Sequence, residues 1–209
     1  MSLRWKVCGI THADDAALAV QAGADALGFV LWPWSPRAVA LEVAAEIAAG
    51  VPEQVWRVGV FVDATAEQLE QAAELVRLDF VQLHGDESPE ACAGAPRPAW
   101  KALRLAPGTS IEQARGQADA YPEATLLIDA RVDGEYGGTG EATDWEAAAV
   151  LATTRQVVLA GGLRPDNVAE AIERVQPWGV DVSSGIELAP GRKDPSKLAA
   201  FARALEPYR

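Results

Sequence analysis

The sequence predicts a single-domain α/β protein, a (β/α)8 (TIM) barrel with a parallel eight-stranded core. Short apolar runs without polar alternation recur along the chain, as is typical of strands that are covered on both faces. Alanine-rich segments with helical periodicity separate these runs, and regular alternation of strands and helices implies parallel pairing. Eight such units in 209 residues fit a closed barrel better than an open doubly wound sheet, which remains the alternative.

The expected strands are five to seven residues long, and they span residues 4–9, 24–30, 57–62, 80–84, 100–105, 125–129, 157–161 and 179–183. The expected helices lie at residues 13–22, 41–49, 66–76, 111–120, 145–152, 165–174 and 195–205, with weaker evidence at 89–93. Two helices carry start signals. Thr65 and Gln68 match a capping box, and Asp194 precedes Pro195 as an N-cap residue precedes proline at the first helical position. No linker or change of composition divides the chain, so we expect one domain over residues 1–209.

The composition excludes several classes of protein. A formal net charge of −12 disfavours binding to nucleic acid or to an anionic membrane, although a small anion can still bind to local backbone amides. No apolar run approaches the roughly 20 residues that a membrane helix needs, and the chain begins with a strand-like segment instead of a signal peptide. We therefore expect a cytoplasmic protein without a membrane partner.

Cysteine and histidine are too few for a disulfide framework or a metal centre. Cys8 and Cys92 lack the paired spacing of a zinc site, and each is interpreted as a free thiol. His12 resembles a turn residue, and no pattern of carboxylates surrounds it or His84. The sequence therefore predicts no metal.

Glycine and serine clusters end the last two expected strands, where barrels of this kind hold phosphate groups. Gly161 and Gly162 end one strand, and Ser183, Ser184 and Gly185 end the next. Small residues let backbone N–H groups approach a phosphate, although glycine can also serve only to make tight turns. Because the feature occurs on two adjacent strands, we favour phosphate binding.

Cys8 and Asp129 end two other strands and are the candidate base and acid. Cys8 shares a strand face with Lys6, whose ammonium favours a thiolate; the alternative is a small buried apolar residue. Asp129 follows an apolar strand, where burial favours the protonated acid; the alternative is a capping or loop residue. The glycine-rich loop at residues 134–140, which we expect to move, supports the functional interpretation of Asp129.

Three further polar residues are placed to line a pocket at this end of the barrel. Arg37, after Ser35 and Pro36, can bind a carboxylate through two parallel hydrogen bonds, or it can be a solvated surface residue. Gln82 and His84 share one face of a strand. His84 either lines the pocket or satisfies a buried hydrogen bond.

Together these residues resemble the phosphoribosylanthranilate isomerase family, and the resemblance extends from Lys6 to about Phe201. The matching motifs agree in order and spacing, and they are Lys6-Val7-Cys8-Gly9-Ile10-Thr11, Ser35-Pro36-Arg37, Gln82-Leu83-His84-Gly85, Gly137-Gly138-Thr139-Gly140, Leu159-Ala160-Gly161-Gly162-Leu163, Asp181-Val182-Ser183-Ser184-Gly185-Ile186-Glu187 and Pro190-Gly191-Arg192-Lys193-Asp194. Two departures are mild: tryptophans at Trp32 and Trp34 alter the expected shape of the pocket, and Ala130 stands where a small hydroxyl residue is frequent.

The resemblance implies an Amadori rearrangement in tryptophan biosynthesis. It converts N-(5-phosphoribosyl)anthranilate to 1-(2-carboxyphenylamino)-1-deoxyribulose 5-phosphate without a cofactor. It implies Asp129 as the acid that opens the furanose ring and Cys8 as the base that removes the C2 proton. It places Arg37 on the anthranilate carboxylate and the backbone at residues 161–162 and 183–185 on the phosphate.

Two other functions compete with this one. A related barrel isomerase of histidine biosynthesis performs the same rearrangement, but its family has an aspartate where this chain has Cys8. A catalytically silent barrel that binds phosphosugars would need the anchors but not the acid and base. The sequence leaves the oligomeric state open.

Overall fold

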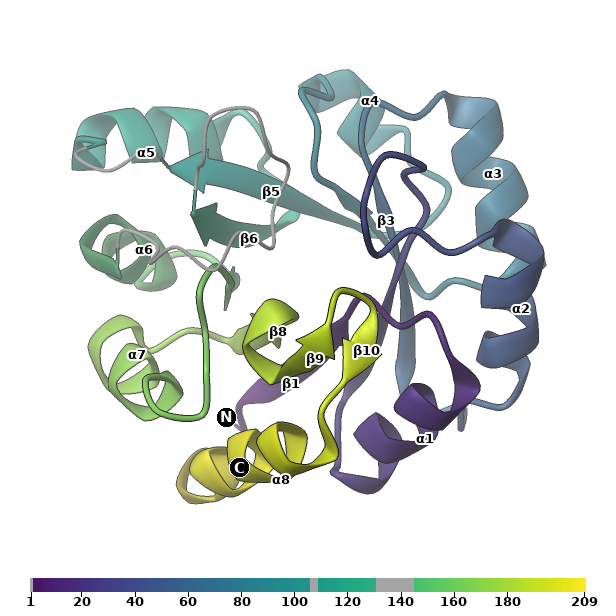
Figure 1. Ribbon diagram of the computed structural model, residues 1–209. Helices are drawn as coiled ribbons and strands as arrows, with labels where there is room; N and C mark the ends of the chain where they lie inside the picture. The colour runs from purple at the N-terminus through teal and green to yellow at the C-terminus, as the bar shows by residue number, and fades with distance from the viewer. Residues whose placement is uncertain (1, 106–108, 131–144) are drawn as a thin grey trace.

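Eight parallel strands close into one barrel in the computed structural model, which describes residues 2–105, 109–130 and 145–209 (Figure 1). The strands are Arg4–Cys8 (β1), Ala26–Val30 (β2), Trp56–Phe61 (β3), Phe80–Leu83 (β4), Ala99–Leu105 (β5), Thr125–Ala130 (β6), Val157–Leu159 (β7) and Gly179–Val182 (β8). The pairing of β8 with β1 closes the ring, with Lys6 beside Asp181. The predicted barrel is therefore confirmed, and the open sheet is excluded.

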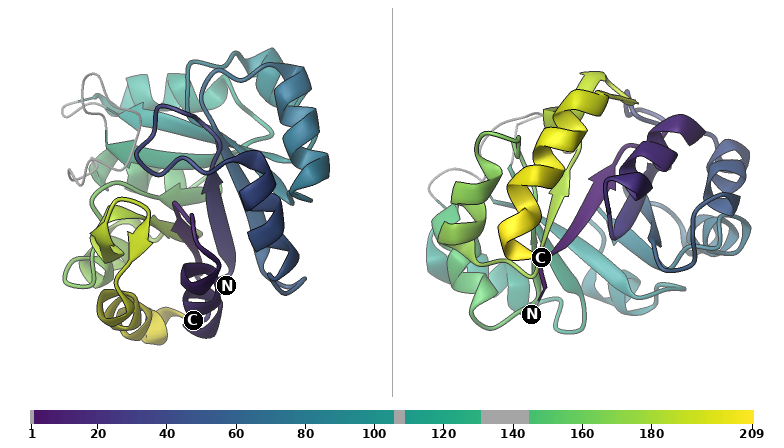
Figure 2. Two further views of the ribbon diagram at one scale, coloured as in Figure 1. Left: turned by 45° about the vertical axis from the view of Figure 1, so that its right-hand side comes forward. Right: turned by 90° about the horizontal axis from the view of Figure 1, so that it is seen from below.

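Helices follow the strands and form an outer layer around the barrel (Figure 2). They are Ala13–Gln21 (α1), Leu41–Ala49 (α2), Ala66–Leu75 (α3), Pro89–Ala93 (α4), Ile111–Asp119 (α5), Trp145–Ala152 (α6), Val168–Val175 (α7) and Pro195–Leu205 (α8). The two ends of the chain lie close together, and the Leu3 N–H donates to the Tyr208 carbonyl. No helix in the described parts of the chain is both long and apolar enough to cross a membrane.

The predicted helix starts are confirmed where the caps were recognised. Thr65 and Gln68 form the reciprocal capping box at α3, and the Asp194 side chain accepts from the backbone of the first turn of α8. One prediction was wrong: α7 begins at Val168 and not at residue 165. The cause is Asn167, whose side chain accepts from the Arg164 N–H and donates to the Gly162 carbonyl, so that a turn precedes the helix.

A short hairpin of Glu187–Ala189 (β9) and Arg192–Lys193 (β10) follows β8 and was not predicted. Its strands are too short for a periodic pattern to reveal them. The Pro190-Gly191 pair between them is a recognised turn signal, and Gly191 has φ +77°. The hairpin lies beside the carboxyl end of β1 (Figure 1).

The barrel interior changes from apolar to polar along its axis. Near the amino ends of the strands, Trp56, Phe80, Trp100 and Trp178 pack as a cluster of rings, with centroids 5.1 to 6.2 Å apart. Small and branched residues above them complete a packed layer, as expected for a barrel of this class. The polar side chains of the interior therefore gather at the carboxyl ends of the strands.

Candidate active site

A pocket of about 690 Å³, a volume that includes open solvent at its mouth, lies at the carboxyl ends of the strands. Nine of the ten residues that the sequence predicts for the site line it, namely Cys8, Arg37, Gln82, His84, Asp129, Gly161, Gly162, Ser183 and Ser184. Trp32 also lines the pocket, whereas Trp34 is 82% exposed and does not. The glycine-rich loop at residues 134–140, with the motif at 137–140, lies outside the described residues.

The buried Lys6 ammonium interacts with both Cys8 and Asp181, two residues that line the pocket. Its Nζ is 3.0 Å from Asp181 Oδ2, and the side chain is 1% exposed. Burial disfavours the ammonium, but Asp181 and Cys8 outweigh that effect and hold the pKa of Lys6 above its usual value. Lys6 therefore carries a positive charge next to the candidate base.

The environment of Cys8 opposes ionisation despite this charge. Burial raises the pKa of the Cys8 thiol, Lys6 lowers it, and Asp181 raises it again, so that the net shift is upward. The predicted direction of the Lys6 effect is confirmed. The sequence did not reveal that burial has the larger effect, because depth in the barrel cannot be inferred from strand position alone.

Gly28 provides the space that this arrangement needs. It pairs with Cys8 across β1 and β2. A Cβ at Gly28 would lie 2.8 Å from Cys8 Sγ and 2.9 Å from Lys6 Nζ, closer than real Cβ atoms approach other atoms. Any side chain at this position would displace the thiol or the ammonium.

Gln82, His84 and Asp129 form a polar chain across the pocket. His84 Nδ1 is 3.0 Å from Gln82 Nε2, and His84 Nε2 is 3.2 Å from Asp129 Oδ2. If the Gln82 amide donates to Nδ1, the imidazole hydrogen lies on Nε2, which makes no hydrogen bond among the described residues although Asp129 lies near it. His84 therefore both lines the pocket and makes a buried hydrogen bond, so the two alternatives drawn from the sequence hold together.

The expected phosphate end of the pocket consists of glycine and serine residues on two adjacent loops. Gly161 and Gly162 have φ of +81° and +63°, a backbone conformation that side chains disfavour. Ser183 Oγ is buried and has no hydrogen-bond partner among the described residues. Gly185 does not line the pocket; it packs against the carbonyl group of Leu163, where a Cβ would clash.

Arg37 enters the pocket from the loop after β2 and already contacts a carboxylate of the protein. Its Nε lies 3.0 and 3.1 Å from the two carboxylate oxygens of Glu187, and its Nη2 lies 2.8 Å from Oε2. Gly9 makes room for this path, because a Cβ there would lie 2.8 Å from Arg37 Cδ. The alternative that Arg37 is a solvated surface residue is thus excluded, and its carboxylate partner in this structure is Glu187.

Sequence reasoning assigned no role to three buried charged residues near the pocket: Asp181, Glu187 and Lys193. All three lie in motifs that it did single out. No group of three or more histidine, cysteine or acidic side chains in the described ranges is arranged to hold a metal ion.

Comparison with known proteins identifies the family. The model of the N-(5'-phosphoribosyl)anthranilate (PRA) isomerase family matches residues 5–204. The chain belongs to this family. A relative from Pseudomonas fluorescens (strain Pf0-1), an N-(5'-phosphoribosyl)anthranilate isomerase, is 47% identical over 205 residues, which cover 98% of each protein.

Solved structures of family members agree with the fold. Phosphoribosyl anthranilate isomerase from Thermotoga maritima superposes with a TM-score of 0.89 at 37% identity, over 98% of this chain and 99% of that one. Another phosphoribosyl anthranilate isomerase, solved in complex with reduced 1-(o-carboxyphenylamino)-1-deoxyribulose 5-phosphate, has a TM-score of 0.86 at 38% identity, over 98% and 99% of the two chains. Membership in the phosphoribosylanthranilate isomerase family favours the tryptophan-pathway reaction over its counterpart in histidine biosynthesis.

Proposed function

We propose that this pocket carries out the family's reaction, the rearrangement of N-(5'-phosphoribosyl)anthranilate to 1-(2-carboxyphenylamino)-1-deoxyribulose 5-phosphate, with Asp129 as the acid and Cys8 as the base. The observation that carries the proposal is that both groups line one pocket, together with Arg37 and the glycine and serine loops. The substrate has an anionic group at each end, a carboxylate and a phosphate, and its sugar lies between them.

The anchors hold the two ends of the substrate. Arg37 binds the anthranilate carboxylate, because a guanidinium pairs with a carboxylate through parallel charge-assisted hydrogen bonds. Backbone groups of Gly161 and Gly162, with Ser183 and Ser184, bind the phosphate. Fixing both ends of the substrate places the sugar carbons against the acid and the base. Holding the reacting groups in this orientation raises the rate of the reaction.

Ring opening is the task of Asp129. Its proton passes to the furanose ring oxygen as the bond from that oxygen to C1 breaks, and the anilino nitrogen forms a cationic Schiff base with C1. His84 Nε2 lies 3.2 Å from Asp129 Oδ2 and makes no hydrogen bond among the described residues, so a small rotation of the ring would let it donate to the resulting carboxylate. Gln82 Oε1 is buried without a partner among the described residues. When the imidazole hydrogen of His84 is on Nδ1 instead of Nε2, the Gln82 amide can turn so that Oε1 accepts from Nδ1.

Proton abstraction is the task of Cys8. Its thiolate removes the C2 proton of the Schiff base, which gives an enolamine. The ketone then forms as C1 takes up a proton and the C2 hydroxyl loses one. The ring oxygen and C1 each gain a proton while C2 and its hydroxyl each lose one, so the substrate is isomerised without net proton change. Lys6 stabilises the thiolate against the effect of burial.

An assay with freshly generated phosphoribosylanthranilate tests the proposal. The expected result is loss of the fluorescence of the anthranilate-containing substrate, with the ketose product identified by mass and by its reduced derivative. The aminoaldose of histidine biosynthesis serves as the control substrate. No turnover of phosphoribosylanthranilate, or comparable kcat/KM values for both substrates, contradicts the proposal of an isomerase dedicated to the tryptophan pathway.

A further inference from the structure

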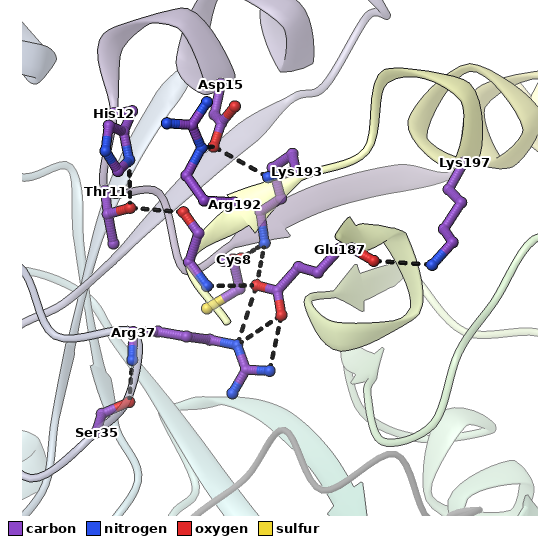
Figure 3. A network of polar contacts seen from close by, with 11 residues as sticks. Cys8, Thr11, His12, Asp15, Ser35, Arg37, Glu187, Arg192, Lys193 and Lys197 are labelled. Atoms are coloured by element: carbon purple, nitrogen blue, oxygen red, sulfur yellow. Dashed lines mark hydrogen bonds and ion pairs between the residues drawn. The ribbon is translucent and has the colours of Figure 1, made fainter. Parts of the chain in front are cut away.

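Glu187, at the start of the β9–β10 hairpin, is the centre of a buried network beside the pocket (Figure 3). Its carboxylate accepts from Arg37 Nε and Nη2, from Lys193 Nζ at 2.8 Å and from the Gly191 N–H at 3.3 Å. Burial opposes ionisation of this carboxyl, but hydrogen bonds from Arg37 and the charge of Lys193 outweigh it and hold the pKa of Glu187 below its usual value. Glu187 is therefore a fixed negative charge behind Arg37.

The contact with Glu187 uses only one edge of the guanidinium. Nε and one hydrogen of Nη2 form that edge, so the outer hydrogens of Nη1 and Nη2 form a second edge that can still accept a carboxylate. A guanidinium held on one edge has lost its rotational freedom before a ligand arrives. Less entropy is then lost when the ligand binds.

Lys193 connects this arrangement to the strand that carries Cys8. Its side chain is fully buried, and Nζ donates to the Cys8 carbonyl at 2.5 Å as well as to Glu187. Figure 3 shows the Glu187 carboxylate between Lys193 and Arg37, with Cys8 beside them. Burial lowers the pKa of Lys193, and the charge of Glu187 acts to raise it, so the Glu187 carboxylate is shared between Lys193 and Arg37 and is not matched to Arg37 alone.

We propose that Glu187 and Lys193 are positioning residues. They orient the free edge of Arg37 toward the substrate carboxylate and fix the position of Arg37 relative to the Cys8 end of β1. The inference rests on the proposed function, in which Arg37 binds that carboxylate. It assigns the hairpin a role in substrate selection, because only a ligand with a carboxylate at this end of the pocket benefits from the aimed edge.

The test compares two substrates in the variant Glu187→Gln. One substrate is phosphoribosylanthranilate, and the other is N-phosphoribosylaniline, the same molecule without the carboxylate. A glutamine side chain keeps the shape but has no negative charge and only one acceptor oxygen for Arg37 and Lys193 together, so the hold on Arg37 is weakened. We expect KM for the carboxylated substrate to rise by about tenfold, equivalent to about 1.4 kcal/mol of binding free energy. We expect the KM for the aniline analogue to stay within about twofold of the parent value.

Glu87→Gln is the matched control, because Glu87 also forms a buried ion pair with a lysine, 2.6 Å from Lys101 Nζ. Neither member of that pair lines the pocket. Loss of this charge should affect both substrates alike. If Glu187→Gln does not fold, Lys193→Met supplies the same test, since it removes the compensating cation and should also raise KM selectively for the carboxylated substrate.

Arg37→Ala separates the possible failures. A selective rise of KM for the carboxylated substrate in Arg37→Ala, with no such rise in Glu187→Gln or Lys193→Met, overturns the positioning role and leaves the proposed function intact. An unchanged KM in Arg37→Ala shows instead that the proposed carboxylate site is wrong. In the double variant of Arg37→Ala with Glu187→Gln, the second change should raise KM no further, because Glu187 acts on the carboxylate through Arg37.

Discussion

Replacement of Gly28 by alanine should slow the enzyme while the fold persists. The added Cβ would lie 2.8 Å from Cys8 Sγ and from Lys6 Cε, and an ordinary contact of 3.4 Å requires each group to retreat by about 0.6 Å. Overpacking of this kind costs about 1–3 kcal/mol of unfolding free energy. A displacement of about 1 Å in a catalytic group can reduce the rate by about 10². We therefore expect kcat to fall by about 10- to 100-fold.

The matched control is Gly116→Ala in α5, where a Cβ would meet nothing within 4 Å. Alanine at an unhindered helical position stabilises the protein by about 0.5–1 kcal/mol relative to glycine, and its kcat should equal that of the parent. Denaturant unfolding and the fluorescence assay, applied to both variants, give the two quantities. If Gly28→Ala retains parental kcat and stability, the crowded arrangement of thiol and ammonium is wrong.

The other predictions concern the acid, the base and its charged neighbour. Cys8→Ala should fold and lose at least about 10² in single-turnover rate, and a rate within about tenfold of the parent, near 1.4 kcal/mol, would exclude Cys8 as the base. Asp129→Asn should bind the reduced product analogue with near-parental affinity while its single-turnover rate falls by about 10² or more; equal losses of affinity and rate would make Asp129 a binding or structural residue. Because burial raises the pKa of Cys8, the kcat/KM of the parent should increase with pH through neutrality as the thiolate forms. Lys6→Met removes the group that lowers this pKa, so in that variant the increase in kcat/KM should occur at higher pH. Lys6→Met should also lose about 3–5 kcal/mol of unfolding free energy because Asp181 is left buried and unpaired, and an unmoved pH profile would contradict the role of Lys6.

The barrel could be predicted because its strands and helices are encoded locally. Apolar runs, alanine-rich helical segments and caps such as Thr65 with Gln68 are each visible within a few residues, and eight repeats determine the architecture. The same logic located the candidate site, because catalytic groups of a barrel lie at the carboxyl ends of its strands. Cys8, Asp129 and Gly161 were found in this way.

Partners that are distant in the sequence could not be predicted. Arg37 and Glu187 are 150 positions apart, Lys6 and Asp181 are 175 apart, and Lys193 reaches the Cys8 carbonyl across 185. The pairing of Lys6 with Asp181 depends on the register of β1 and β8 in the closed barrel. The other two pairings depend on the β9–β10 hairpin, which no periodic pattern predicts. For the same reason, the net pKa shift of Cys8 emerged only when its burial was known.

The division of labour between Asp129 and Cys8 is the central claim, and a deuterium isotope effect tests it most directly. Single-turnover rates of phosphoribosylanthranilate with hydrogen or deuterium at C2 are compared in Asp129→Asn and in Cys8→Ala. If Asp129 opens the ring, Asp129→Asn stalls before the C2 bond breaks and shows no primary isotope effect. If Cys8 removes the C2 proton, that step limits Cys8→Ala, and a primary isotope effect appears there. A primary effect in Asp129→Asn together with none in Cys8→Ala would reverse the two assignments and contradict the mechanism.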